Sequence, residues 1–190
     1  MIRAGDSIQN PVTGERITFL ATSRDTDGEA VVIETIVQPK GFVAATHVHP
    51  FQTERFAVVD GALGLKVGRK KQTLGPDEVA LVEPGTAHRF WNAGEEEVRF
   101  VCEIRPALDF ESLLETMFGL AADGRTNRKG MPNPLRLAVI AKAHFDVVRL
   151  PWIPVWMQRA GLALAAPVGR LLGYRRTYEP IAGTAAVAAA

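Results

Sequence analysis

The sequence predicts a mainly β fold, a sandwich or barrel of short strands that is followed by C-terminal α-helices. From residue 16 to residue 105, short runs rich in β-branched and apolar residues alternate with turn residues, and no helical stretch separates them. After Pro106 the apolar residues recur at helical spacing. We therefore expect a β-barrel domain over residues 1–106, a helical extension over 107–182, and a disordered low-complexity tail over 183–190.

The strands are expected in a regular order along the first domain. Asp25 to Gly28 supply the turn between the first two, and a turn near Gly68 divides the third segment, in which apolar and polar residues alternate. The predicted segments are 16–23, 30–38, 62–74, 79–82, 88–92 and 98–105.

Three helices are expected in the extension. Asp109 is placed to cap the first, which runs to a stop at Gly124, and Asn133 with Pro134 gives a cap and first residue for the second, which continues to Pro151. A third, over 155–174, has Pro167 as an expected kink.

Composition restricts the class of protein. The chain has 190 residues, a net charge of +1, one cysteine and four histidines, so neither a strong field for nucleic acid nor an internal disulfide is expected. No apolar run reaches the roughly 18 residues that a membrane span needs. We expect a cytoplasmic protein without a membrane span and without a nucleic-acid partner.

Three of the four histidines stand in turn-and-strand contexts near one acid. His47 and His49 are two residues apart, so on a strand both point to one face, and Pro50 ends that strand. Glu54 then opens the next strand, from which a carboxylate can reach the same point, and His88 follows a Pro-Gly turn. Three imidazoles and one carboxylate make a site for one divalent ion, either Fe, Mn, Ni, Zn or Cu. The alternative is a chance arrangement in which each histidine is satisfied by a core partner or by solvent.

These residues resemble two motifs of the cupin superfamily. The pattern Gly41-x5-His47-x-His49-x4-Glu54-x6-Gly61 matches the first motif, and the run from Pro84 to Asn92 looks like the second, P-G-x2-H-x3-N. Asp77 and Glu83 stand where the second motif has glycine and proline, which puts the geometry of strand entry in question but touches no ligand.

The resemblance implies a double-stranded β-helix, or jelly-roll barrel, over about residues 15–105. Within it, His47, His49, Glu54 and His88 would bind the metal. The C-terminal half is similar to the helical extension of some small bacterial single-domain cupins, on NPLRLAV and GRLLGYR. A group of this kind has no settled reaction, and a homodimer is expected because the barrel has strand edges to cover.

Strand parity predicts an apolar substrate pocket around the metal. Phe56 and Val58 share the parity of Glu54, and Phe90 shares that of His88. Cys102 lies on one face of the last strand and is expected to be a small core residue. Gln52 is either a hydrogen-bonding group beside the ligands or a solvent-facing turn residue.

Three functions remain open from the sequence. The first is a metal-dependent enzyme, an oxidoreductase with dioxygenase-like chemistry or an isomerase, acting on a small, largely apolar or aromatic molecule. Its catalytic base is not evident: Glu54 could switch between ligand and base, and Glu34 is a remote candidate. The others are a non-catalytic small-molecule-binding module and a metal-stabilised storage barrel. Trp152 and Trp156 are expected to pack against the barrel or a second subunit.

Overall fold

The computed structural model describes residues 2–180, in which strands precede helices along the chain. The predicted tail over 183–190 lies outside the described residues. The elements are β1 (Ser7–Asn10), β2 (Glu15–Ala21), β3 (Val31–Val37), β4 (Thr53–Asp60), β5 (Leu63–Val67), β6 (Lys70–Leu74), β7 (Val79–Val82), β8 (His88–Asn92), β9 (Val98–Arg105), α1 (Phe110–Ala122), α2 (Pro134–Ala143) and α3 (Val155–Leu171).

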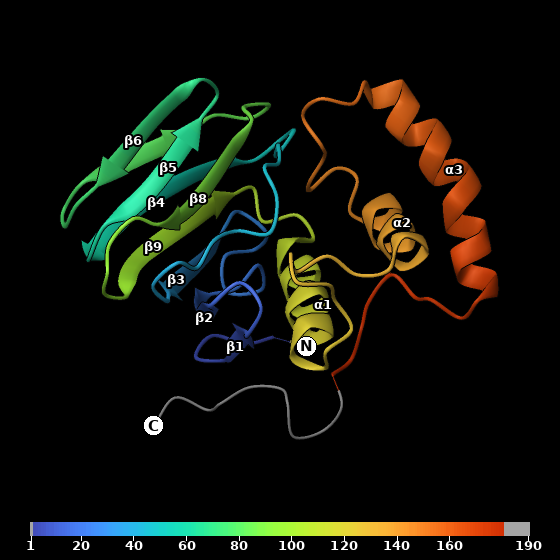
Figure 1. Cartoon of the computed structure of the whole chain (residues 1–190), viewed down its shortest axis with the longest axis horizontal. Coiled ribbons are helices and arrows are strands. Elements are labelled where there is room, and N and C mark those ends of the chain that lie inside the picture. The colour runs from blue at the N-terminus through green and yellow to red at the C-terminus, as the bar shows by residue number, and fades with distance from the viewer. Residues whose placement is uncertain (1, 181–190) are drawn as a thin grey trace.

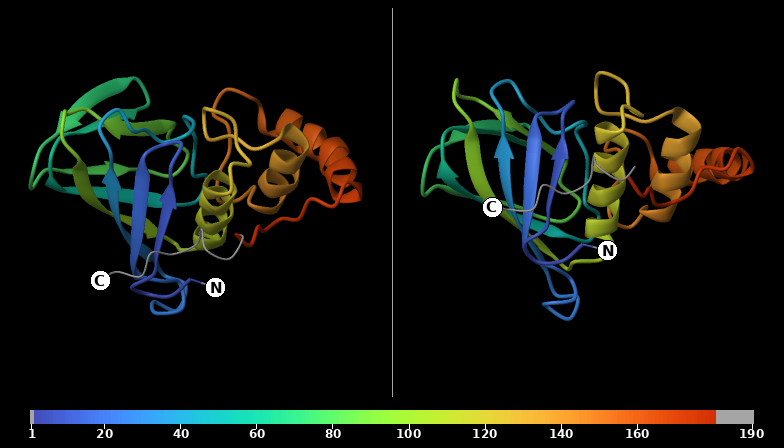
Figure 2. Two further views of the ribbon diagram at one scale, coloured as in Figure 1. Left: turned by 60° about the horizontal axis from the view of Figure 1, so that its bottom comes forward. Right: turned by 90° about the horizontal axis from the view of Figure 1, so that it is seen from below.

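The strands form two antiparallel sheets that face each other. One has the order β1-β2-β3-β9-β4-β7 and the other the order β6-β5-β8. The helices stand together on one side of this barrel, with α1 nearest to the strands and α3 outermost (Figures 1 and 2). This is the double-stranded β-helix of the cupin type with three C-terminal helices, so the predicted fold class is confirmed.

The strands pack by strict alternation. Along β9, Val98, Phe100, Cys102 and Ile104 are buried, while the residues between them are half-buried or exposed. Because successive side chains of a strand point to opposite faces, this alternation gives the large sheet one apolar inner face. That inner face forms the core and also the inner wall of the site.

The differences from the predicted elements have local causes. Strand β1 was not predicted; it is a short edge strand that pairs only with β2. Helix α2 ends at Ala143, earlier than expected, because the chain turns there and Arg149 then pairs with Val48. Helix α3 runs through Pro167. The side chain of Asp109 makes no capping hydrogen bond.

Two positions of the first motif are glycine for steric reasons. A Cβ on Gly41 would lie 2.6 Å from Cγ1 of Val37 and 2.8 Å from two backbone oxygens, closer than real Cβ atoms come. Gly61 has a φ of 79° and its Cβ would lie 2.5 Å from the backbone oxygen of Glu97. Both positions therefore require glycine.

Asp77 resolves the question raised at the second motif. It has a φ of 64°, the left-handed conformation that glycine adopts readily and that aspartate tolerates better than most residues. Its N–H donates to the backbone oxygen of Val58 at 3.0 Å. The backbone of the turn before β7 is thus kept without the glycine.

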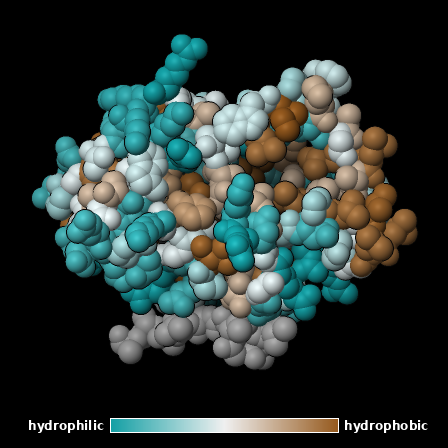
Figure 3. Space-filling model, viewed as in Figure 1, coloured by the Kyte–Doolittle hydropathy of each residue, from teal (hydrophilic) through white to brown (hydrophobic). Residues whose placement is uncertain are grey.

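The outer face of the helices carries large exposed apolar side chains. Trp152 and Trp156 are 67% and 71% exposed and Leu171 is 88% exposed, so within the chain the tryptophans do not pack against the barrel. These apolar residues gather over α3, where Figure 3 shows a hydrophobic surface beside the largely hydrophilic barrel. None of the described helices has the length and hydrophobicity to cross a membrane.

A second buried carboxyl group of the large sheet, besides Glu54, is that of Glu15. Glu15, at the start of β2, is 7% exposed and points to the same face as Ile17 and Phe19. Burial raises its pKa from 4.5 to about 7, and a hydrogen bond from the Thr13 hydroxyl offsets only part of that effect. The folded chain therefore binds a proton at Glu15 more tightly than the unfolded chain does.

Replacing Glu15 by glutamine should flatten the pH dependence of stability. A folded-state pKa above the unfolded one gives stability that is present below about pH 4.5 and is lost as the pH rises through about 7. Relative to Glu15→Gln, the wild type should lose up to about 2.5 kcal/mol of unfolding free energy between pH 5 and pH 8. Urea denaturation at both pH values measures it, and an equal difference at both would contradict the assignment.

Candidate metal centre

Both sheets and a connecting segment contribute to one cluster of side chains. Glu54 comes from β4 in the large sheet, His88 from β8 in the small sheet, and His47 and His49 from the segment between β3 and β4. That segment is not a regular strand as predicted; His47 makes an isolated antiparallel bridge with His88. One ligand atom from each of the four lies within 4.8 Å of the others.

Each imidazole is held by its Nδ1 atom. The Nδ1 atoms of His47, His49 and His88 lie 2.8, 2.6 and 2.9 Å from the backbone oxygens of Ala45, Val147 and Thr86 respectively. Because a carbonyl oxygen only accepts, Nδ1 must carry the hydrogen in each ring. In the neutral imidazoles Nε2 is then an unprotonated acceptor, the form that binds a metal.

The atoms at the centre fit a cation. Nε2 of His88 lies 2.6 Å from Oε2 of Glu54, and Nε2 of His49 lies 3.5 Å from Oε1 of the same carboxylate. These two nitrogens and Oε2 are buried without a hydrogen-bond partner that satisfies them. A proton on His88 would satisfy one contact only, whereas a divalent ion would satisfy every converging lone pair. Buried polar atoms left without partners are costly, so these atoms fit a cation at their centre.

The electrostatics of the cluster differ from ring to ring. Burial alone would lower the pKa of His88, but its hydrogen bond with Glu54 and the attraction of that carboxylate outweigh burial and raise the pKa, so a metal at the centre must displace a proton from this ring. Burial lowers the pKa of His47 to about 3, and repulsion from the other two imidazoles adds to the effect, so this ring is neutral near pH 7. Burial by itself would raise the pKa of Glu54, but the surrounding imidazoles outweigh it and lower the pKa to about 2. Glu54 is thus the anionic member of the cluster, among three imidazoles.

The helical extension reaches into this cluster. The backbone oxygen that orients His49 belongs to Val147, in the segment between α2 and α3. Val48, next to His49, and Arg149, two residues after Val147, exchange two backbone hydrogen bonds of 3.0 and 2.9 Å. A residue of the metal site is therefore oriented by the helical extension and not by the barrel.

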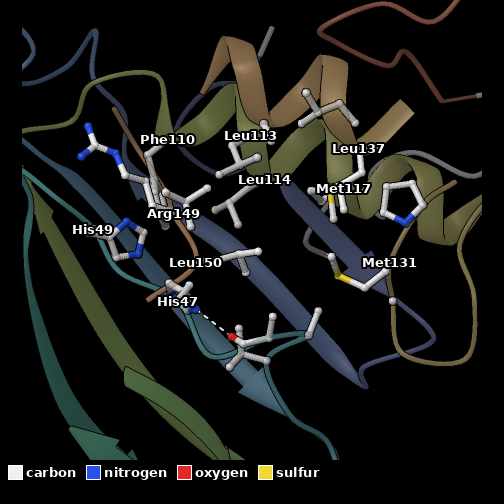
Figure 4. A pocket seen from close by; sticks show the side chains of 18 of the residues that line it. His47, His49, Phe110, Leu113, Leu114, Met117, Met131, Leu137, Arg149 and Leu150 are labelled. Carbon is white, nitrogen blue, oxygen red and sulfur yellow. Dashed lines mark hydrogen bonds between the residues drawn. The ribbon is translucent and has the colours of Figure 1, made fainter. Parts of the chain in front are cut away.

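A cavity of about 790 Å³ opens at the metal cluster between the barrel and the helices. His47 and His49 are at one end, Leu113, Leu114 and Leu150 lie along it, and Met117 and Met131 lie toward the other end (Figure 4). Its walls are mostly apolar, and all three helices contribute to them. This is the usual character of a small-molecule site.

The structure brings together most of the predicted pocket residues. Phe56, Phe90 and Cys102 line the cavity together with His47, His49 and Glu54. Burial raises the pKa of the Cys102 thiol well above its ordinary value. Val58 is buried in the core and is not part of the cavity wall. Gln52 is fully buried, also away from the wall, and its amide nitrogen donates to the backbone oxygens of Pro106 and Ala107. That any of these five residues binds a ligand stays a prediction.

Sequence reasoning missed the polar residues at the far end of the cavity and the wall formed by the helices. Glu15 lines the cavity, whereas Glu34, weighed as a base, is not part of its wall and lies 3.7 Å from Arg99. The available signal for Glu15 was its parity with Ile17 and Phe19, which places an acid on an apolar strand face. Nothing in the local sequence signals the role of the Val147 carbonyl.

Comparisons with known proteins find likenesses over the barrel and, for two fungal proteins, over most of the chain. Residues 33–103 match the family model of the cupin domain. An oxidoreductase of Arthrobotrys oligospora is 26% identical, covering 90% of this chain and 75% of its own length. The probable oxidoreductase virH of Hypocrea virens is 28% identical, covering 94% and 87%. Among solved structures, a predicted oxalate decarboxylase of Thermotoga maritima shows 16% identity and a TM-score of 0.49, covering 56% of this chain and 99% of its own.

The family match covers the part of the chain from β3 to β9, and it agrees with the cupin-type fold of the barrel. The alignments with the two fungal proteins extend into the helices, because residues 1–106 make up little more than half of the chain. Since both proteins are fungal, they lend no support to a bacterial group in particular. The candidate metal ligands are those that the cupin motifs predicted.

Removing two ligands should abolish metal binding. The His47→Ala/His88→Ala double variant leaves one imidazole and one carboxylate, so metal per chain should fall from about one to near zero after dialysis. Elemental analysis of purified protein measures it. The matched control is His144→Gln, which removes the buried fourth histidine at the end of α2, outside the cluster. Metal retained by the double variant would refute the site.

Metal binding should also protect the segment of the helical extension that holds His49. A fixed His49 ring strengthens its bond to the Val147 carbonyl and steadies the paired amides of Val48 and Arg149. Hydrogen exchange with and without added metal should therefore slow at both amides. Exchange that slows around residues 47–49 and 88 but not at Arg149 would show that the helical segment is uncoupled from the metal.

Proposed function

We propose that the protein is a metal-dependent oxidoreductase with dioxygenase-like chemistry that acts on a small, largely apolar or aromatic molecule. The observation that carries the proposal is the geometry of the cavity: a cluster of three imidazoles and one carboxylate stands at the end of an apolar space of about 790 Å³. The likeness to two proteins named as oxidoreductases over most of the chain supports it.

The residues of the chain would provide position and environment. His47, His49, Glu54 and His88 would hold a divalent metal, which supplies Lewis-acid and one-electron chemistry when bound. Phe56 and Phe90 on the barrel and Leu114 on α1 would hold a flat apolar molecule beside the cluster and keep water from it. Apart from the candidate metal ligands, the ionisable groups of the wall near the cluster are a protonated thiol, at Cys102, and Arg149. Because few groups near the cluster can accept a proton, oxidation is favoured over proton transfer. A second role for Glu54 as a base stays a prediction.

The second candidate is a non-catalytic module that binds a small molecule. The exposed apolar face of α3, which includes Trp156 and Leu171, favours it, because a partner on that face could respond to a ligand in the cavity that α3 also lines. We place the expected homodimer contact on the same face. In sedimentation, the wild type should then be a dimer and Trp156→Glu a monomer. We also propose that the protein is cytoplasmic and that it belongs among small bacterial cupins with a helical extension.

Oxygen uptake distinguishes the enzyme from the binding module. Protein loaded in turn with Fe, Mn, Ni or Cu should consume oxygen with at least one member of a panel of phenolics, flavonoids and diketones. Glu54→Ala should lower this uptake to background, since loss of even an outer group that supports a ligand typically costs 10- to 100-fold in affinity or activity. Glu34→Ala, which removes a carboxylate outside the cavity wall, is the matched control. Uptake unchanged by Glu54→Ala, or none with any metal, would reject the enzyme.

A further inference from the structure

A second group of polar side chains faces the cavity, at the end away from the metal cluster. Asn10, Glu15 and Thr35 all line the cavity wall, and they are only 4%, 7% and 1% exposed. Their neighbours on the same strand faces are apolar, among them Ile17 and Ile33. Polar side chains at such positions are exceptions in an otherwise apolar wall.

Strand register places the three residues beside one another. Asn10 and Glu15 are direct partners across β1 and β2. Glu15 is opposite Val37 on β3, and Thr35 is two residues from Val37, so Thr35 is the diagonal neighbour of Glu15 on the same face.

The same register separates this group from the metal cluster. Glu54 is opposite Ile104 on β9, which is opposite Val31 on β3, six positions from Val37. At about 3.3 Å a residue, the two ends are roughly 20 Å apart along the strand direction. The loop before α2 covers this end, because a Cβ on Gly130 would come within 3.1 Å of Thr13, the partner of Glu15.

Each of the three residues has hydrogen-bonding capacity to spare. Oε2 of Glu15 accepts from the Thr13 hydroxyl at 2.6 Å, and Oδ1 of Asn10 accepts from the backbone N–H groups of Val12 and Thr13. Among the described residues, no partner is found for Oε1 of Glu15, for the amide nitrogen of Asn10 or for the hydroxyl of Thr35. The three residues line the cavity, and these atoms are not among the fully enclosed unsatisfied ones.

A role in stability alone does not account for Glu15. Its bond with Thr13 could be replaced by an apolar contact without leaving a buried charge, and burial of this carboxyl makes the folded chain less stable as the pH rises. A buried group that costs stability and lines a cavity is better explained by what it binds.

We propose that Asn10, Glu15 and Thr35 form a recognition site for a hydroxyl or amino group at one end of an elongated, otherwise apolar ligand, whose other end lies at the metal cluster. This inference rests on the proposed binding of a small apolar molecule in the cavity and adds its polar anchor. The ligand's donor hydrogen goes to Oε1 of Glu15, and the Asn10 amide and Thr35 hydroxyl complete the bonds. A ligand that lacks the donor leaves these buried groups unpaired and is rejected.

Two probes that differ in one hydrogen-bond donor test the site. Fluorescence titration of the metal-loaded full chain with 2-naphthol and 2-methoxynaphthalene at pH 8 gives both dissociation constants. The wild type should prefer 2-naphthol by at least about tenfold, the effect of one hydrogen bond to a charged group. Glu15→Leu should remove the preference by weakening naphthol binding while methoxynaphthalene binding is kept or improved.

A second pair of variants keeps the test valid if Glu15→Leu does not fold. Thr35→Val, nearly the same in shape, should reduce the preference, and Thr18→Val on the opposite face of β2, where the hydroxyl bonds to Ser7, should leave it unchanged. If neither probe binds the wild type, the proposed apolar site itself fails. If both bind equally, or if the preference survives Glu15→Leu and Thr35→Val, the cavity stands and the polar anchor is refuted.

Discussion

The site depends on three hydrogen bonds from imidazole Nδ1 atoms to backbone oxygens. They fix the rings of His47, His49 and His88, so that the Nε2 atoms converge on the carboxylate of Glu54. Converging lone pairs in a buried place are unfavourable unless a cation joins them. The backbone of the barrel and of the helical segment thus builds a cluster that fits one metal ion.

The helices complete what the barrel begins. A carbonyl between α2 and α3 orients His49, and side chains from all three helices close the cavity over the open side of the barrel. This gives the cavity two ends of different character, metal ligands at one and uncharged or weakly acidic polar groups at the other. The arrangement favours a long, mainly apolar molecule, since its apolar middle would lie between Leu113, Leu114 and Met117.

The fold and the grouping of the four candidate ligands could be predicted because they depend on local spacing. Strand alternation, the motif glycines and the His-x-His pair are short-range signals, and the structure explains Gly41 and Gly61 by contacts within the barrel. The contribution of Val147 could not be predicted, since a backbone carbonyl has no signature in sequence and acts on a residue 98 positions away. The end of α2 was misplaced for a related reason: the pairing of Arg149 with Val48 overrides a helical pattern that continues to Pro151.

The most direct measurement is the anomalous diffraction of crystals grown from the metal-loaded protein. We expect one peak per chain within about 2.0–2.2 Å of Nε2 of His47, His49 and His88 and of a carboxylate oxygen of Glu54, the usual range for such bonds. The peak should also leave the Nδ1 atom of His49 bonded to the Val147 carbonyl. A peak elsewhere, or histidine rings turned so that Nε2 atoms point apart, would contradict the account.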